Sequence, residues 1–273
     1  MVYNMITLHL QGGLGNQMFQ LFSALAYSIE HNEKLIISTH KYDEKERPTY
    51  WNSLFKKLKD NVDPTVPNCP RLCEEAFHYT PLPKKSGVML FGYFQSYRYF
   101  DKHYEAIYKR LNFKLERELI KSKYLRMTRT ISLHFRIGDY IHLQLHHPIL
   151  NDQYYTKSIQ EIIDRTQSTD WNVIYYCEEK DNLPVKQRMR NIKKKFPDLT
   201  FYKAEDEMED WEQLLLMSCS DHNIIANSAF SWWAAYLNSN PQKIVCYPNT
   251  WFGASNYDKS TKDLCPSSWV KVS

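Results

Sequence analysis

Apolar residues recur along this chain in two spacings, one typical of strands and the other of helices. Residues 6–10 alternate apolar and polar positions, as a half-buried strand does, and residues 34–38 form a second apolar run. Between them, apolar side chains return every three or four positions from Met18 to Ile29, the spacing of an amphipathic helix. A strand, a turn, a helix and a strand in this order predict a parallel β-α-β unit.

The same alternation starts again near residue 130. Before that point, residues 40–86 are polar, rich in proline and irregular, while 88–94 predict a strand and 99–127 a helix. The second series consists of strands at 130–135, 171–177, 199–202, 222–226 and 243–247, alternating with helices at 152–166, 184–196, 209–218 and 229–238. The restart predicts an α/β fold of two Rossmann-like domains, residues 1–125 and 126–273, that face a binding cleft.

The composition fits a folded α/β protein and excludes other classes. The 273 residues include 35 Lys and Arg, 31 Asp and Glu, and 15% aromatic residues. A net charge of +4 is too low to indicate a nucleic-acid-binding protein. Nucleic-acid binding stays open only through Lys56, Lys57, Lys59 and Lys193 to Lys195, which solvated helix faces explain better. The aromatic content also excludes a disordered chain or a coiled coil.

The sequence carries no membrane or secretion signal. No run approaches the roughly 20 apolar residues of a membrane-spanning helix, and the first residues lack a basic segment followed by a cleavage site. We therefore expect a soluble, cytoplasmic protein without an integral membrane segment, and peripheral membrane association stays open. Four of the six cysteines stand alone in apolar segments, as reduced core thiols do.

Metal-binding patterns are weak in this chain. Cys69 and Cys73 are spaced C-x3-C without a nearby His, and His142, His146 and His147 lie in a proline-containing loop without matching carboxylates. No Asp-x-Asp sequence occurs. The sequence therefore predicts no bound metal.

The first candidate site is the segment GGLGNQ at residues 12–17, which lies between the first predicted strand and helix. Glycine lets a ligand approach the backbone closely. The segment lacks the Lys of a Walker loop and the third Gly of the dinucleotide fingerprint, so by itself it could be a tight turn. Asn16 and Gln17 favour a binding role, because side-chain amides can hydrogen-bond sugar hydroxyls.

The second candidate site is HFRIGDY at residues 134–140, at the carboxyl end of the first strand of the second half. Ligands of doubly wound sheets bind outside such strand ends. Arg136 suits a diphosphate there, because its guanidinium is a rigid and permanently charged fork of donors. His134 lies two residues earlier, on the same face of the strand. The alternative is an ion pair between Arg136 and Asp139 that only holds the turn.

The third candidate site is the Asn227-Ser228 pair, where an apolar strand leads into a helix. Either side chain can cap the helix while the free amides of its first turn face an anion. The aromatic residues that follow fit the core or a cleft wall better than a catalytic role; they are Trp232, Trp233 and Tyr236.

Six segments resemble, in order, the α-1,2-fucosyltransferases of glycosyltransferase family 11. They are GGLGNQMFQ at 12–20, GYFQSYRYF at 92–100, HFRIGDY at 134–140, DWEQLLLMS at 210–218, NIIANSAFSWWAAYLN at 223–238 and YPNTWF at 247–252. In this order they are distributed over almost the whole length of the chain, from residue 12 to residue 252. The resemblance implies a GT-B fold and the use of GDP-fucose as donor, with no metal or other cofactor.

The resemblance also implies roles for single residues. Arg136 would bind the GDP diphosphate and stabilise the leaving charge, with His134 beside it at the nucleotide. The other residues that it implicates are Asn227, Ser228 and Ser231 on the phosphate and sugar side, and Gly13, Asn16 and Gln17 on the acceptor side of the cleft. Asp139 is the candidate for the base that activates the acceptor hydroxyl.

Two positions depart from the family pattern. Ile137 stands where the family usually has a second Arg, so the donor site carries one positive charge fewer. Cys177-Glu178-Glu179 stands where many members have Ser-Asp-Asp, which leaves the guanosine contacts there open.

The expected function is inverting transfer of L-fucose from GDP-β-L-fucose to the 2-hydroxyl of a galactose-containing glycan, by a galactoside α-1,2-fucosyltransferase. The alternatives are a transferase for another GDP-sugar or linkage, and a nucleotide-sugar or glycan-binding protein that has lost its catalytic activity.

Overall fold

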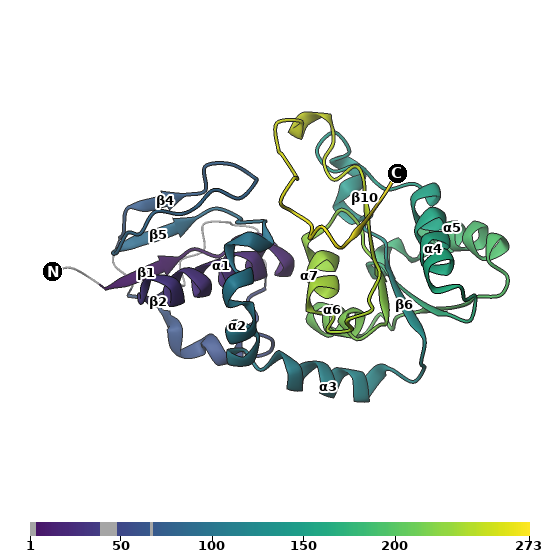
Figure 1. Ribbon diagram of the computed structural model, residues 1–273, viewed down its shortest axis with the longest axis horizontal. Coiled ribbons are helices and arrows are strands. Elements are labelled where there is room, and N and C mark those ends of the chain that lie inside the picture. The colour runs from purple at the N-terminus through teal and green to yellow at the C-terminus, as the bar shows by residue number, and fades with distance from the viewer. Residues whose placement is uncertain (1–3, 39–47, 66–67) are drawn as a thin grey trace. The chain divides into compact units, whose positions relative to one another are not determined.

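The computed structural model describes residues 4–38, 48–65 and 68–273 (Figure 1). It divides into two compact units: unit 1 is Met1–Glu116 with Lys259–Pro266, and unit 2 is Arg117–Asp258 with Ser267–Ser273. The division falls inside one helix, whereas the sequence placed the domain boundary between residues 125 and 126. The segment expected to be irregular at 40–86 includes residues 40–47 and 66–67, which lie outside the described residues.

Unit 1 contains a parallel sheet of five strands in the order β3-β2-β1-β5-β4. The strands are β1 (Met5–Leu8), β2 (Lys34–Ser38), β3 (Val62–Asp63), β4 (Arg71–Cys73) and β5 (Val88–Phe91). The helices are α1 (Leu14–His31) and α2 (Tyr104–Arg110), with short 3-10 turns at η1 (Lys56–Asn61), η2 (Tyr97–Tyr99) and η3 (Asp101–His103). The strand-helix-strand unit predicted from residues 6–38 is confirmed as β1-α1-β2.

The single helix predicted over 99–127 is wrong. The chain forms α2 and then α3 (Phe113–Tyr124), which crosses the division between the units. Asn112 separates the two helices with a left-handed φ of 60°. Asn adopts this conformation more readily than most residues, so it ends a helix without interrupting the charge and apolar pattern that predicted one.

Unit 2 contains a parallel sheet of six strands in the order β11-β10-β9-β6-β7-β8. The strands are β6 (Thr130–His134), β7 (Asn172–Tyr176), β8 (Thr200–Lys203), β9 (His222–Ile224), β10 (Val245–Pro248) and β11 (Val270–Val272). Counted from β6, this is the 3-2-1-4-5-6 order of the dinucleotide-binding fold. The expected α/β class with Rossmann-like halves is therefore confirmed, and the strand order reverses between β6 and β9.

Helices cover both faces of the unit 2 sheet (Figure 1). They are α4 (Asp152–Thr166), α5 (Asn182–Lys195), α6 (Asp210–Ser218) and α7 (Ala229–Leu237), with 3-10 turns at η4 (Gly138–His142), η5 (Glu179–Asp181) and η6 (Ala254–Asn256). Every residue of β6 is buried, as expected for a central parallel strand. Trp232 and Trp233 of α7 are fully buried, which confirms their prediction as core residues.

None of the helices in the described part of the chain is long and apolar enough to cross a bilayer.

Candidate functional site

The candidate site lies at the carboxyl ends of β6 and β9, two neighbouring strands of unit 2. Because the strand order reverses between them, their following loops leave the sheet in opposite directions, and a crevice opens at this point in such folds. The loop after β6 contains Arg136, and the loop after β9 leads through Asn227 into α7. Two of the three segments singled out in the sequence therefore meet at the switch point of one sheet.

Arg136 holds two carboxylates with the two ends of its guanidinium. One amino group pairs with Glu178 and the other with Asp139. The Arg136 side chain is 21% exposed, whereas those of Glu178 and Asp139 are 41% and 45% exposed. Its guanidinium carbon also lies 4.8 Å from the centre of the Tyr140 ring. The arginine is thus fixed in place while its partners are exposed side chains, and two phosphate oxygens could replace them with the same geometry.

Asp181 stabilises the turn that contains Arg136. The Gly138 N–H donates to Asp181 Oδ2 at 2.7 Å, and Asp181 is 3% exposed. Gly138 has a φ of +35°, and a Cβ at this position would come within 2.7 Å of Glu178 Oε1. The positive φ therefore favours glycine here, whereas the Glu178 carboxylate is the end of an exposed side chain that can move aside.

His134, the last residue of β6, presents an unpaired nitrogen at the site. The residue is 7% exposed, and its Nδ1 is buried without a hydrogen-bond partner among the described residues. Its ring lies 5.5 Å from that of Phe230 in the first turn of α7. Burial, aided by the charge of Arg136, lowers the pKa of His134 to about 3. The imidazole is therefore neutral at physiological pH and can offer a hydrogen bond but no charge.

The start of α7 divides the three predicted polar residues into two kinds. Ser228 caps the helix, with its Oγ accepting from the Phe230 N–H at 3.3 Å. Asn227 donates its amide to two backbone carbonyls, those of Pro148 and Trp251, at 3.0 and 3.1 Å. The Ser231 Oγ accepts from the Ala226 N–H at 3.2 Å. Ser228 thus lies at the helix entrance, while Asn227 and Ser231 hold the turn that forms it.

A hydrogen bond links the two loops of the site. The Tyr140 hydroxyl donates to the Asn227 carbonyl at 3.1 Å. Burial raises the pKa of Tyr140, so the hydroxyl keeps its proton. Because Tyr140 also lies against the Arg136 guanidinium, this contact sets the distance between the arginine turn and the first amides of α7, which have no partner within the helix.

The departures from the family pattern lie in different environments. Ile137 is 5% exposed and belongs to the hydrophobic core of unit 2. The Cys177 thiol is also buried in this core, where it donates to Asn182 Oδ1 at 3.4 Å. Glu178, in contrast, reaches the site, and its other oxygen lies 2.7 Å from Lys180 Nζ. Burial acts to raise the pKa of Glu178, but Lys180 and Arg136 outweigh it and lower that pKa.

In unit 1, the glycine-rich segment forms the loop between β1 and α1. Gly12 has a φ of +76°, and a Cβ there would lie 2.5 Å from Asn16 Nδ2. A Cβ at Gly13 would meet nothing within 4 Å. Asn16 accepts from Gln95 Nε2 at 2.6 Å, which joins the loop to the one that follows β5. Gln17 is 3% exposed and donates to the Gly12 and Pro48 carbonyls, both at 3.0 Å. Gly13 and Asn16 are thus the open members of this group, and Gln17 supports the loop.

Several residues that shape these loops were not singled out in the sequence. Asp181 holds the Arg136 turn, and Gln95 pairs with Asn16. Gln20 clamps the glycine loop: its Oε1 accepts from the Gln11 N–H, and its Nε2 donates to the Gln11 and Asn16 carbonyls. Gln95 and Gln20 both lie inside segments that resemble the family, which was a signal for them. Asp181 lies outside those segments, and only the folded structure indicates it.

Among the residues described at 4–38, 48–65 and 68–273, no group of three or more His, Cys, Asp or Glu side chains is arranged to hold a metal ion.

The sequence matches a glycosyltransferase family model and known glycosyltransferases. The sequence profile of glycosyl transferase family 11 matches residues 2–273. An alpha-1,2-colitosyltransferase of Escherichia coli is 29% identical, over 98% of this chain and 99% of the relative. The O-antigen biosynthesis glycosyltransferase WbnK, also of Escherichia coli, is 31% identical, over 70% of this chain and 63% of the relative.

The solved structures that match this chain have low sequence identity to it. A variant of Arabidopsis thaliana FUT1 in complex with GDP has a TM-score of 0.49 and 11% identity, covering 89% of this chain and 70% of that one. POFUT1 in complex with GDP-fucose has a TM-score of 0.47 and 10% identity, covering 89% and 96%.

Proposed function

The chain belongs to glycosyl transferase family 11 and is a glycosyltransferase, and we propose that it moves L-fucose from GDP-β-L-fucose to the 2-hydroxyl of a galactoside, with inversion and without a metal. The reaction is a single displacement in which the acceptor hydroxyl attacks the anomeric carbon while GDP leaves. Unit 2 binds the nucleotide in this proposal, and Gly13 and Asn16 of unit 1 contribute to the acceptor side.

The observation that carries the proposal is the arrangement of Arg136 at the switch point of the unit 2 sheet. Its guanidinium already binds two carboxylates, one at each end, and both are exposed. A diphosphate presents oxygens of the same charge and spacing to such a fork. When the donor binds, it takes the place of at least one of these carboxylates.

The arginine stabilises the leaving group. As the sugar-phosphate bond breaks, negative charge develops on the β-phosphate, and a donor fixed in place before the reaction stabilises that charge. The first amides of α7, beside the Ser228 cap, provide a second set of donors of the same kind. Neutral His134 contributes a hydrogen bond from its buried ring without adding charge.

Asp139 is the proposed base for the acceptor hydroxyl. In the described structure it pairs with Arg136, and this pairing alone would make it a holder of the turn. Its second role follows from the exchange described above: a diphosphate bound to Arg136 would release Asp139 to accept a proton.

Independence from metal is a separate part of the proposal. The groups that would balance the diphosphate charge are all protein groups, namely Arg136 and the start of α7. We expect transfer to continue undiminished in excess EDTA. Loss of activity on chelation that manganese or magnesium restores would show that a metal bridges the diphosphate instead.

The donor sugar is tested directly. The purified protein is incubated with GDP-fucose and a panel of galactosides, and the linkage of any product is determined by NMR. A parallel reaction uses GDP-colitose, because the relative that matches this chain over nearly its full length is named a colitosyltransferase. A fucosylated product with an α-1,2 linkage supports the proposal. Product from GDP-colitose alone would assign the second donor, and GDP binding without any transfer would indicate a protein that has lost its activity.

A further inference from the structure

Helix α5 is strongly basic and carries no acidic residue. Its sequence from Asn182 to Lys195 is NLPVKQRMRNIKKK. The apolar residues Val185, Met189 and Ile192 are buried against the core of unit 2. Arg188 is the one basic residue of this helix with an ion pair in the described structure, and it binds Asp152 of α4.

The remaining basic residues gather on the outer face of the helix. Lys186, Arg190, Lys193 and Lys194 are spaced i, i+4, i+7 and i+8, and such positions share one face of a helix. All four are exposed, and no hydrogen bond or ion pair joins them to another described residue. Leu183, at 70% exposure, lies one turn before Lys186 on the same side. We call these five residues the basic face of α5.

Neighbouring elements form no ion pair with the four basic side chains of this face in the described structure. On α4, which packs beside α5 (Figure 1), Glu161 pairs with Arg165, and Asp164 accepts a hydrogen bond from the neutral Gln160 amide. Asp152 is engaged by Arg188. Lys193 and Lys194 lie in the last turn, where the helix dipole favours basic residues, and Lys193 Nζ lies 5.8 Å from the centre of the Phe201 ring. Lys186 and Arg190 are like charges at i, i+4, which destabilise a helix, and neither has an ion-pair partner among the described residues of unit 2.

We propose that the basic face of α5 docks on the surface of an anionic lipid bilayer. Exposed lysine and arginine side chains are attracted to anionic headgroups, and Leu183 can enter the interfacial layer beside them. A single-stranded nucleic acid fits less well, because the five residues include no aromatic side chain on which a base could stack. The opposite face of α5 is buried in the core, so the helix lies on the surface without inserting.

The basic face of α5 lies close to the candidate site along the sequence. Asp181, which holds the Arg136 turn, immediately precedes α5, and Leu183 is the second residue of the helix. Contact with a bilayer would therefore hold the nucleotide-binding edge of unit 2 near the membrane surface. This docking does not depend on the identity of the donor sugar, so it goes beyond the proposed function.

The test is sedimentation of the full chain with lipid vesicles. One set is pure phosphatidylcholine, and the other contains about 30% phosphatidylglycerol, a typical anionic headgroup content for such assays. Binding is expected only to the anionic vesicles and should fall as salt is raised. Replacing Lys186, Arg190 and Lys193 together by Gln should weaken it about a hundredfold, since each basic residue near an anionic surface contributes about fivefold.

The matched control removes the same charge elsewhere. Lys57→Gln, Lys84→Gln and Lys114→Gln change three exposed lysines of unit 1, and this triple variant should bind the vesicles as the parent chain does. Transfer to a soluble acceptor, or the melting temperature if no transfer is found, shows that both variants remain folded. Equal losses in the two variants would overturn the proposal, because only net charge would then matter. Binding to poly(U) but not to anionic vesicles would also overturn it and assign the face to nucleic acid.

Discussion

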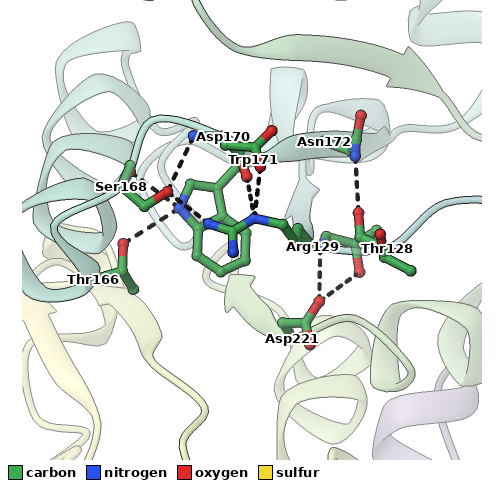
Figure 2. A network of polar contacts seen from close by, with 9 residues as sticks. Thr128, Arg129, Thr166, Ser168, Asp170, Trp171, Asn172 and Asp221 are labelled. Carbon is green, nitrogen blue, oxygen red and sulfur yellow. Dashed lines mark hydrogen bonds and ion pairs between the residues drawn. The ribbon is translucent and has the colours of Figure 1, made fainter.

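The central strand β6 has an arginine at each end, and the two arginines have different surroundings. Arg129 immediately precedes the strand, and Arg136 follows it by two residues. At the amino end, Arg129 donates to the Asp170 carbonyl at 2.7 Å and to the Ser168 hydroxyl at 2.6 Å (Figure 2). Its guanidinium also lies 4.7 Å from the centre of the Trp171 ring. These partners belong to one short loop of the same unit.

The other hydrogen bonds at the amino end involve mainly backbone groups, and Arg129 Nε also lies 3.1 Å from the exposed Asp170 carboxylate. Asp221 accepts from the Thr130 N–H at 2.7 Å, and Asn172 donates to the Thr128 carbonyl at 2.8 Å (Figure 2). The Trp171 indole donates to the Ser168 carbonyl at 3.1 Å. Backbone groups take part in most of these bonds, and they cannot move away without unfolding the strand ends.

At the carboxyl end, the partners can be exchanged. Arg136 binds the exposed side chains of Glu178 and Asp139. Nearby, His134 Nδ1 and Asn227 Oδ1 are buried without a partner in the part of the chain that the structure describes. Buried polar atoms are nearly always hydrogen-bonded. Among the described residues the amino end leaves one such atom as well, His222 Nε2, so the unpaired atoms alone do not distinguish the two ends. The two ends differ in what the arginine binds: Arg129 is held partly by a backbone carbonyl, whereas Arg136 pairs with two exposed carboxylates.

The largest effect is expected from adding a second charge at the carboxyl end. Ile137→Arg should destabilise the protein by about 3–5 kcal/mol, because Ile137 is 5% exposed in the core and an unpaired arginine would be buried there. Urea unfolding measures the change, with Ile137→Leu as a control that should cost less than about 1.5 kcal/mol. If Ile137→Arg were instead stable and had a lower KM for the donor, residue 137 would face the nucleotide.

The two arginines should separate activity from stability. Arg136→Ala should lower the transfer rate about 100- to 1000-fold, because it removes the charge that stabilises the leaving group. Arg136→Lys should recover little of it, since an ammonium cannot make the two-pronged contact. Arg129→Ala is the matched control: it should keep most of the turnover but lose about 1–2 kcal/mol of unfolding free energy. Arg136→Ala with more than half of the parent turnover would contradict the assignment.

Acid should destabilise unit 2 through a buried histidine at each end of the sheet. The pKa of His134 is lowered from 6.5 to about 3, so the unfolded chain takes up this proton first as the pH falls. The contribution of neutral His134 to the free energy of unfolding is fully present above pH 6.5 and is lost progressively down to pH 3, with about 2 kcal/mol lost by pH 5. Burial lowers the pKa of His222 at the amino end in the same direction. Unfolding at several pH values should therefore show a shallower dependence in His134→Asn, and an unchanged dependence would contradict the prediction.

A smaller effect is expected from removing the Glu178 carboxylate, which would compete with a diphosphate for Arg136. Glu178→Gln should tighten GDP binding about threefold to tenfold. The diphosphate would then no longer have to break the ion pair between Arg136 and Glu178, which contributes roughly 1 kcal/mol. Calorimetric titration with GDP measures the change. Glu179→Gln removes a neighbouring exposed charge and should leave the affinity unchanged. Weaker GDP binding by Glu178→Gln would show that Glu178 itself contacts the nucleotide.

The sequence by itself determined the elements whose signal is local. The predicted bounds of β2 (Lys34–Ser38) and α4 (Asp152–Thr166) agree with the structure, because their apolar spacing and end signals lie within each segment. The position of Arg136 just beyond a central strand could also be predicted, because the apolar strand and the turn that follows it lie within one segment. The order of motifs along the chain was enough to indicate the family.

The tertiary structure decided what depends on distant residues. Strands β3, β4 and β11 have only two or three residues each and exist because a neighbouring strand supplies their hydrogen bonds, so no periodicity could reveal them. The pairing of Arg136 with Glu178 joins the ends of two strands, and the donor bonds of Gln17 go to its own loop and to Pro48. Periodicity records which face of an element is buried. Which polar atom meets which partner is fixed only when strand order brings separate loops together, and this is why the roles of Asn227, Ser231 and Gln17 could not be assigned from the sequence.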